Sequence, residues 1–379
     1  MSAESTPGPG IPGDTGTDGA RHRGKGKRRK PQGRRRKGLM ITAWAAAGIV
    51  VVGGAGAGYL YFKLNGNLKS VDIDQALGTD RPKKADNGSE NILVLGSDTR
   101  SGSNKKLGGG TDDGSARSDT AMIVHIYKGH KKASVVSIPR DTLIDRPSCT
   151  DTEGNEHPAA QNAMFNSAYS TGGAACAVKT VESITDLRMD HYLEVDFAGF
   201  QKLIDDLGGV EITTTKSIDD PDSHLKLKAG THTLDGRQAL GLVRTRHGVG
   251  DGSDLGRIQL QQAFIKALVN QIKDVGVFSN PKKLLDLAET ATKTVTADSD
   301  LGSVNKLASF ANGLKGISPS NMHMITMPVA YDPADPNRVL LQKKKADQIW
   351  KALEHDKPIP RSATSGSATG EAKGVVSAP

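Results

Sequence analysis

The sequence predicts an α/β domain that follows a single membrane-spanning helix. Short, β-branched apolar runs alternate with helical patterns between about residues 89 and 355, which is typical of an α/β domain. Residues 39–62 form an uncharged stretch between a basic tail and this domain. The chain has 379 residues, of which 36% are hydrophobic, so it is long enough for one sizeable domain with unstructured ends.

Residues 1–38 carry the whole positive excess of the chain. The formal net charge is +8, and residues 21–38 hold eleven Lys or Arg and no acid, against three acids in residues 1–20. The tail is rich in Gly and Pro, and we expect it to be a disordered cytoplasmic tail. Its charge predicts attraction to anionic membrane lipid. Because the tail lacks interleaved aromatic residues, we expect no binding to nucleic acid.

Residues 39–62 have the length and composition of a transmembrane helix. Their 24 residues would span roughly 36 Å as a helix, enough to cross a bilayer core of about 30 Å with some tilt. The basic tail places the N-terminus in the cytoplasm and residues 63–379 outside the cell membrane. Aromatic residues at both ends are typical of interfacial anchors: Trp44, Tyr59, Tyr61 and Phe62.

Two features of this segment leave alternatives open. Ala55-Gly56-Ala57 resembles a signal-peptidase site, so a cleaved signal peptide is the alternative to a membrane anchor. Gly54 and Gly58 form a GxxxG pair that could support a weak dimer through the helix. Chance spacing in a Gly/Ala-rich span also explains that pair.

Outside the membrane, the sequence divides into three parts. Residues 63–88 are expected to be an extracellular tether, and residues 89–355 the folded domain. Residues 356–379 are rich in Ser, Ala, Gly and Thr, and we expect a disordered C-terminal tail.

Within the domain, the order of elements follows from hydrophobic periodicity and turn residues. The short turn at residues 128–132 predicts a hairpin between the second and third strands. The expected strands are residues 91–95, 120–127, 133–138, 209–215 and 322–329. The expected helices are residues 174–185, 196–209, 258–273 and 345–354.

Charged residues flank the ends of the first three predicted strands. If these strands are neighbours that run up, down and up, all the flanking residues meet at one edge of the sheet, where ligands of open α/β sheets often bind. The residues are Asp98, Arg100, Arg117, Asp119, Arg140 and Asp141.

The aspartates of this edge suggest a divalent cation. Two carboxylates about 5 Å apart repel each other by roughly 3 kcal/mol at an effective dielectric constant near 20. A proton, an arginine or a cation removes that cost. No His or Cys stands at ligand spacing, which favours Mg²⁺ over zinc. Alternatively, Asp98 and Asp119 cap turns or pair with Arg100 and Arg117.

A second group of polar residues lies in residues 243–264. Asp254, Arg257 and Gln261 are spaced to share one face of a helix. Arg244 and Arg246 alternate, so on a strand they would point the same way. Together with Arg140, four arginines could converge, and a diphosphate bound with a metal is the natural anion for them. Salt bridges on a solvated surface are the alternative for any single arginine.

The cysteines and histidines are assigned from their context. Cys149 and Cys176 would lie in an external domain, which predicts a disulfide that stabilises the fold by about 3 kcal/mol. His247 could be a general acid or a structural residue, and His191 is expected to be structural.

Seven blocks of the sequence carry a resemblance to a known family. In order from about residue 91 to 272 they read NILVLGSDTR, RSDTAMIVHI, VVSIPRDT, NSAYSTGG, DHYLEVDFAGFQKLIDDLGGVEI, LDGRQALGLVRTRH and DLGRIQLQQAFI. Together they resemble the LytR-CpsA-Psr (LCP) family of cell-envelope proteins. The resemblance implies a basic cytoplasmic tail, one membrane span and an external catalytic domain. The implied fold is an α-β-α sandwich around a central mixed sheet, with a hydrophobic pocket for a polyprenyl chain.

The resemblance also implies an activity and the residues that carry it. Members are thought to transfer a glycopolymer from a polyprenyl diphosphate carrier to peptidoglycan through a phosphodiester bond, as in teichoic acid attachment. Such phosphoryl transfer depends on positioning and charge neutralisation. The implied Mg²⁺ ligands are Asp98, Asp119 and Asp254. The implied diphosphate-binding residues are Arg100, Arg117, Arg140, Arg244, Arg246, Arg257 and Gln261. The implied catalytic residues are Asp98, as general base, with Arg140, Arg246 and Asp254.

Departures and alternatives remain. Leu260 and Met164 stand where the family often has Arg and Lys. The same residues would serve a hydrolase that releases the glycan from the carrier diphosphate to water. A membrane-bound transcriptional regulator, which would bind nucleic acid through residues 21–38, is the third hypothesis.

Overall fold

The computed structural model describes residues 55–56, 58–98, 118–247, 249–250, 252–277, 280–368, 372 and 374–378. From Tyr59 onward the chain forms one compact unit. Most of the predicted span, residues 39–62, lies outside the described residues, and so does Gly54 of the GxxxG pair. In the described part, no helix is both long enough and apolar enough to cross a membrane.

A central mixed sheet organises this unit. The predicted up, down and up neighbours are confirmed, since β2 pairs antiparallel with β3 and β3 pairs antiparallel with β4. Strands β9 and β15 join this group in parallel, next to β2 and β4. In spatial order the strands are β1 (Lys69–Val71), β14 (Val295–Asp298), β9 (His191–Asp196), β2 (Glu90–Ser97), β3 (Ser118–Ile126), β4 (Ala133–Ile138) and β15 (Met322–Thr326).

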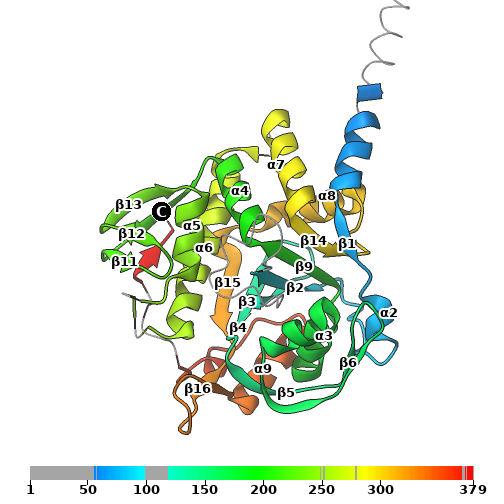
Figure 1. The fold of residues 1–379 in the computed structure, drawn as a ribbon, viewed down its shortest axis with the longest axis vertical. Helices are drawn as coiled ribbons and strands as arrows, with labels where there is room; N and C mark the ends of the chain where they lie inside the picture. Colours follow the sequence, from blue (N-terminus) through cyan, green and yellow to red (C-terminus); the bar gives the residue numbers. More distant parts are fainter. Residues whose placement is uncertain are drawn as a thin grey trace, which may run out of the picture. The chain divides into compact units, whose positions relative to one another are not determined.

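One face of the sheet is tightly packed. Leu93, Leu95 and Ile123 point to this face and are fully buried. Burying each such side chain stabilises the fold by roughly 1.5–3 kcal/mol. Figure 1 shows two of the covering helices, α3 and α9, together on this side of the sheet. The helices whose residues enter this core are α2 (Asp74–Leu77), α3 (Ser167–Thr185) and α9 (Lys343–Glu354).

The opposite face is less tightly covered. Because side chains alternate along a strand, Val94, Val124 and Leu193 point to this face, and they are only partly buried. These three apolar side chains therefore keep part of their surface accessible, while Ile92 and Ile126 on the same face are buried. The helices on this side are α4 (Phe197–Leu207), α6 (Asp254–Asp274), α7 (Pro281–Thr294) and α8 (Val304–Gly313).

A second core lies beside the sheet. Ile212, Leu234 and Phe264 are buried there, between a small antiparallel sheet and helix α6. Its elements are β10 (Val210–Thr214), β11 (Ile218–Asp220), β12 (Leu225–Leu227), β13 (Gly230–Leu234), α5 (Gly236–Arg244) and β18 (Val376–Ser377). Strand β18 comes from the C-terminal segment and pairs with β10.

The predictions for the two flanking segments are wrong within the described residues. The C-terminal segment, expected to be disordered, packs Ala363 and Val376 into the domain, and Figure 1 shows its red strand beside β11 to β13. The expected tether, residues 63–88, supplies strand β1 to the central sheet and buries Ile73 and Leu77. Both segments have turn-like compositions, yet a few apolar side chains and backbone pairings hold them.

A smaller four-stranded sheet completes the unit. The predicted strand over residues 322–329 is divided, because Pro328 separates β15 from β16. The sheet contains β16 (Val329–Tyr331), β17 (Val339–Leu341), β5 (Thr142–Arg146) and β8 (Ala160–Met164). The remaining short elements are β6 (Cys149–Thr150), β7 (Glu156–His157), η3 (Leu314–Gly316), η4 (Pro319–Asn321) and η5 (Arg361–Ala363).

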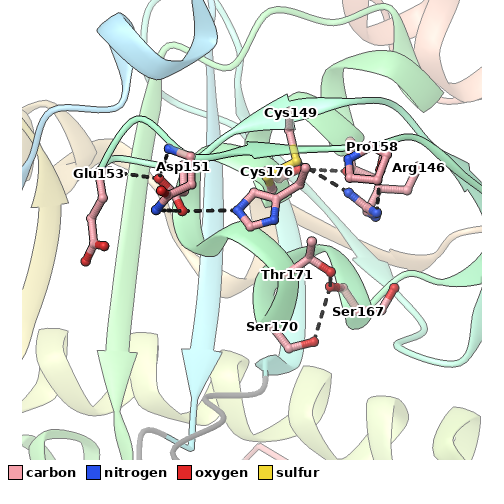
Figure 2. Close-up of a disulfide and its surroundings, with 12 residues drawn as sticks. Arg146, Cys149, Asp151, Glu153, Pro158, Ser167, Ser170, Thr171 and Cys176 are labelled. Atoms are coloured by element: carbon pink, nitrogen blue, oxygen red, sulfur yellow. Dashed lines mark hydrogen bonds and ion pairs between the residues drawn. A yellow bond between two sulfur atoms is a disulfide. The ribbon is translucent and has the colours of Figure 1, made fainter.

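Cys149 and Cys176 form a disulfide, as the sequence predicts. Figure 2 shows it joining strand β6 to helix α3, with Arg146 on one side. The guanidinium of Arg146 donates to the carbonyl of Pro158 at 2.7 Å, which holds the loop beside the sulfur atoms. A side chain at residue 172 would overlap Sγ of Cys176, so Gly172 leaves the room that the disulfide needs.

Candidate active site

The strand ends bring two predicted site residues into contact. Asp119 is the second residue of β3, and Arg140 lies two residues beyond the end of β4. Arg140 Nη1 donates to Asp119 Oδ1 at 2.6 Å. Asp98 is buried directly after β2, whose end is paired with the start of β3. Two other residues predicted at this edge, Arg100 and Arg117, lie outside the described residues.

Helix α6 adds a second set of side chains. Ser253 caps the helix by accepting from Gly256 N at 3.4 Å. The predicted shared face is present, because Asp254 and Arg257 form an ion pair one turn apart. Arg257 also donates to the carbonyl of Asp119 at 2.8 Å, and Gln261 Nε2 donates to Thr120 Oγ1 at 2.9 Å. These bonds fix the start of α6 against β3.

Arg244 and Arg246 are not on a strand, contrary to that expectation. A capping box at Asp235 and Gln238 starts helix α5, and apolar residues at helical spacing continue it to Arg244. The Arg244 guanidinium lies 4.9 Å from the ring centre of Phe197, at the start of α4. Arg246 follows in the next turn, and both arginines line the same cavity.

Asp220 holds that turn in place, and the sequence reading missed it. Its carboxylate is 1% exposed and accepts from the backbone N–H groups of Arg246 at 2.9 Å and His247 at 3.1 Å. It also accepts from the N–H groups of Asp222 and Ser223. Burial raises the pKa of Asp220, but these four donors outweigh it and hold the pKa below its ordinary value. The local sequence indicates only a turn, so no local signal could have found this role.

The electrostatics of the cluster favour a bound anion. Burial lowers the pKa of Arg246, and the charges of Arg257 and Arg140 lower it further. Within the described part of the chain, the Arg246 side chain makes no hydrogen bond or ion pair. Burial raises the pKa of Asp119, but the charges of Arg257, Arg140 and Arg246 hold that pKa below its ordinary value. Among the described residues, Arg140 and Arg257 are paired with aspartates, and the guanidinium of Arg246 remains available to an anion.

Two cavities flank this cluster, and Arg246 lines both. The first, of about 210 Å³, is lined by Asp119, Asp220, Asp222, Ser223, Arg244, Arg246, His247 and Arg257. The second, of about 240 Å³, includes Arg140, Asp141, Arg246 and Asp254 in its lining. An anion with several oxygens, such as a diphosphate, could accept from arginines of both cavities at once.

The predicted magnesium ligands fit in part. Asp98 and Asp119 lie at adjoining strand ends, and Mg²⁺ is usually held by one or two carboxylates together with phosphate oxygens. Asp254 instead lies against Arg257 and 3.5 Å from Arg140 Nε. Both of its carboxylate oxygens are buried and have no hydrogen-bond partner among the residues that the structure describes. These three aspartates do not form one of the ligand clusters found among the described residues.

A different trio does have its ligand atoms within 4.8 Å: Asp220, Asp222 and His247. Four N–H groups already occupy the oxygens of Asp220, and the side chains of Asp222 and His247 are largely exposed. His247 Nδ1 lies 3.1 Å from Asp222 Oδ2. We therefore regard the trio as a structural turn. The possible role of His247 as a general acid stays a prediction.

A sequence model of the LytR_cpsA_psr family matches residues 60–355. The chain belongs to the LytR-CpsA-Psr family. The resemblance seen in the sequence motifs is thereby confirmed, and the match begins before the predicted domain boundary at residue 89.

Named relatives of this LytR-CpsA-Psr protein include cell-wall enzymes. The chain is 30% identical over 315 residues to the cell wall biosynthesis protein LcpA of Corynebacterium glutamicum, which covers 76% of this chain and 59% of LcpA. It is 29% identical over 343 residues to the polyisoprenyl-teichoic acid–peptidoglycan teichoic acid transferase TagT of Bacillus subtilis. That alignment covers 88% of this chain and 98% of TagT. This chain therefore spans less than two thirds of LcpA but nearly all of TagT.

The fold matches solved structures of the family. A LytR-Csp2A-Psr enzyme from Actinomyces oris superposes with a TM-score of 0.55 at 22% identity, over 76% of this chain and 96% of that one. At this identity the likeness establishes the mixed α/β fold.

One departure from the family pattern has a structural explanation in this LytR-CpsA-Psr protein. Leu260, where the family often has Arg, is 1% exposed and packs in the second core with Phe264. Leu260 lies one turn after Arg257 on α6, and its place in this core accounts for an apolar side chain there. Nothing in the structure explains Met164, which lies on β8.

Proposed function

We propose that this protein transfers a glycopolymer from a polyprenyl diphosphate carrier onto peptidoglycan, forming a phosphodiester bond at the outer face of the cell membrane. The observation that supports this most strongly is the group of Arg140, Arg246 and Arg257 around Asp119, of which Arg257 is buried and the other two are partly buried. Arg246 has no ion-pair partner among the described residues. The relative TagT, a polyisoprenyl-teichoic acid–peptidoglycan teichoic acid transferase, supports the same activity.

In the proposed reaction, a peptidoglycan hydroxyl oxygen attacks the phosphorus atom that carries the glycan. A new P–O bond forms to the acceptor, and the bond from that phosphorus to the bridging oxygen breaks. The bridging oxygen keeps the electron pair and leaves as polyprenyl monophosphate. Arg140, Arg246 and Arg257 bind the phosphate oxygens and stabilise the charge that develops on them.

The proton of the attacking hydroxyl needs an acceptor. Asp98 is a carboxylate at the edge of the cluster and is proposed to take this proton. Asp119 is held in its ionised form by three arginines and is better suited to orient Arg140. Asp98 and Asp119 would hold Mg²⁺, which supplies further positive charge to the diphosphate oxygens.

The lipid chain is proposed to lie against the less tightly covered face of the sheet. Val94, Val124 and Leu193 are apolar, central in the sheet and only partly buried. Covering such a surface with a polyprenyl chain would remove apolar area from water at about 25 cal/mol per Å². The membrane span predicted at residues 39–62 would keep the domain near its lipid-linked donor.

The test is a transfer assay with the full chain in detergent. The protein receives Mg²⁺, a glycan labelled in its sugar on polyprenyl diphosphate, and a peptidoglycan acceptor. Label joined covalently to peptidoglycan, and lost after addition of a chelator, is the expected result. Label released as free glycan phosphate with the acceptor present would replace transfer with hydrolysis as the function.

A further inference from the structure

We propose that the loop between β16 and β17, with Tyr331, Asn337 and Arg338, forms a saccharide-binding subsite beside the arginine cluster. This inference rests on the proposed transfer function, because it names the part of the substrate that lies next to the diphosphate. The sequence motifs end near residue 272, so none of these three residues carried the resemblance.

The loop and the arginine cluster line one cavity. The cavity of about 240 Å³ has Tyr331, Asn337 and Arg338 on one side, with Arg140 and Arg246 also in its lining. Whatever fills it therefore adjoins the phosphates that the arginines would bind. In the proposed reaction the acceptor hydroxyl attacks the phosphorus atom that carries the donor glycan. Apart from the lipid diphosphate itself, the donor glycan and the acceptor are therefore the two groups that lie next to this atom. Both belong to saccharides.

The loop is held in one conformation by its own hydrogen bonds. Asp332 N donates to the carbonyl of Arg338 at 3.0 Å, which closes the loop. Asp332 Oδ1 accepts from Ala334 N, and Asp335 Oδ1 accepts from Asn337 N, both at 2.9 Å. A preformed loop loses little conformational entropy when a ligand binds.

A contact to helix α6 anchors the subsite to the catalytic residues. Tyr331 Oη donates to Ser253 Oγ at 3.3 Å, and Ser253 is the residue that caps α6 before Asp254. Tyr331 is 41% exposed, so part of this residue is accessible to solvent. The loop and the start of α6 therefore form one continuous wall.

The side chains suit a sugar better than a lipid or a further phosphate. An aromatic ring offers an apolar surface to the C–H face of a sugar, and Asn and Arg offer several donors to its hydroxyl groups. The carboxylates of Asp141 and Asp254 also line this cavity and would repel an additional phosphate. The cavity is smaller than the 300–1,000 Å³ usual for sites of drug-sized ligands, which suits a short part of a polymer.

The experiment measures steady-state transfer by the full chain in detergent and its N337A/R338A variant. One series varies the labelled donor at saturating acceptor, and the other varies a GlcNAc–MurNAc disaccharide-peptide at saturating donor. We expect KM for one of the two substrates to rise about tenfold, while kcat changes by less than about threefold. A rise for the donor assigns the subsite to the donor glycan, and a rise for the acceptor assigns it to peptidoglycan. Both KM values unchanged would overturn the proposal.

Controls separate this proposal from the proposed function. R361A removes an exposed arginine outside the cavity and should leave both KM values unchanged. If the wild-type chain transfers no label, direct titration with the same disaccharide-peptide and with the glycan–polyprenyl diphosphate decides the subsite. Weaker binding of either saccharide by N337A/R338A then supports it, and equal binding of both contradicts it. Y331F, which keeps the ring, should bind more tightly than Y331A.

Discussion

Arg246 lies partly buried near two other arginines, the buried Arg257 and the partly buried Arg140, and in the protein alone this arrangement costs free energy. Like charges about 6 Å apart repel by roughly 3 kcal/mol at an effective dielectric constant near 20. The lowered pKa of Arg246, caused by burial and by Arg257 and Arg140, reports that cost. Arg140 differs, because Asp119 and Asp254 lie against it. The two arginines therefore have different effects on stability although both are proposed to bind the diphosphate.

A pair of substitutions tests this difference. Arg140→Ala leaves Asp119 without its partner and should lower the free energy of unfolding by about 1–3 kcal/mol. Arg246→Ala relieves repulsion and should leave that free energy within about 0.5 kcal/mol of wild type. Both should lower transfer at least a hundredfold. Thermal unfolding and the transfer assay measure the two effects. The control is Arg237→Ala, an exposed arginine on α5. Loss of stability in Arg246→Ala equal to that in Arg140→Ala would contradict the electrostatic interpretation.

Asp220 is interpreted as a positioning residue, since it binds the backbone of Arg246 and not the substrate. Asp220→Asn removes the charge that four N–H donors share, and should raise KM for the donor and cost about 1–3 kcal/mol of stability. Because it acts through Arg246, the same substitution in an Arg246→Ala background should change KM little further. A double-mutant cycle measures this coupling. Additive effects on KM would mean that Asp220 acts independently of Arg246.

At the scale of elements, side chains join segments that are distant in the sequence. His191 on β9 lies 3.3 Å from Asp298 on β14, and Asp298 also accepts from Tyr192 N at 2.8 Å. Burial lowers the pKa of His191, but the bond to Asp298 and its charge outweigh burial and raise the pKa above its ordinary value. The predicted structural role of His191 agrees with this pairing.

The pair predicts a pH dependence of stability. Because folding raises the pKa of His191, its charged form stabilises the folded state. This contribution is fully present below the pKa of His in the unfolded chain, about 6.5, and is lost as pH rises through the pKa in the folded state. Wild type should therefore exceed His191→Gln by about 1 kcal/mol at pH 6, and by less at pH 8.5. Denaturant unfolding at several pH values measures the difference. A gap between the two proteins that does not change with pH would exclude a charged His191.

The disulfide between Cys149 and Cys176 also joins two elements, β6 and α3, and should stabilise the fold. Reduction, or the double substitution Cys149→Ser with Cys176→Ser, should cost about 2–5 kcal/mol and lower Tm by several degrees. Calorimetry with and without reductant measures it. The double variant is the matched control, because its Tm should not respond to reductant. A wild-type Tm that is insensitive to reductant, with free thiols confirmed by labelling, would contradict a stabilising role.

For the whole molecule, local patterns predicted the elements that bury a continuous apolar face. The strands expected at residues 91–95, 120–127 and 133–138 match β2, β3 and β4, because one face of each is fully buried. The C-terminal strand β18 could not be predicted, since it forms by backbone pairing to β10, far away in the sequence. Strand β1, residues 69–71, could not be predicted either, because it forms by pairing with β14, which is also far away in the sequence.

The candidate site was predictable to a similar extent. Spacing predicted that Asp254 and Arg257 share one helix face, and strand order predicted that Asp119 and Arg140 lie at one edge of the sheet. The ion pairs that these residues form are seen only in the structure. The helical setting of Arg244 was missed because two alternating arginines resemble a strand when the capping box before them is overlooked. The loop with Asn337 and Arg338 has no motif, and its place beside the arginines follows only from the tertiary fold.

The central claim is that the arginine cluster is a diphosphate site, and direct binding tests it. The measurement is the Kd of polyprenyl diphosphate for the full chain in detergent micelles with Mg²⁺, compared with Arg246→Ala and Arg237→Ala. Charge-assisted bonds of about 1.5–3 kcal/mol predict that Arg246→Ala weakens binding at least tenfold, while Arg237→Ala binds like wild type. Equal Kd values for all three proteins would contradict the claim.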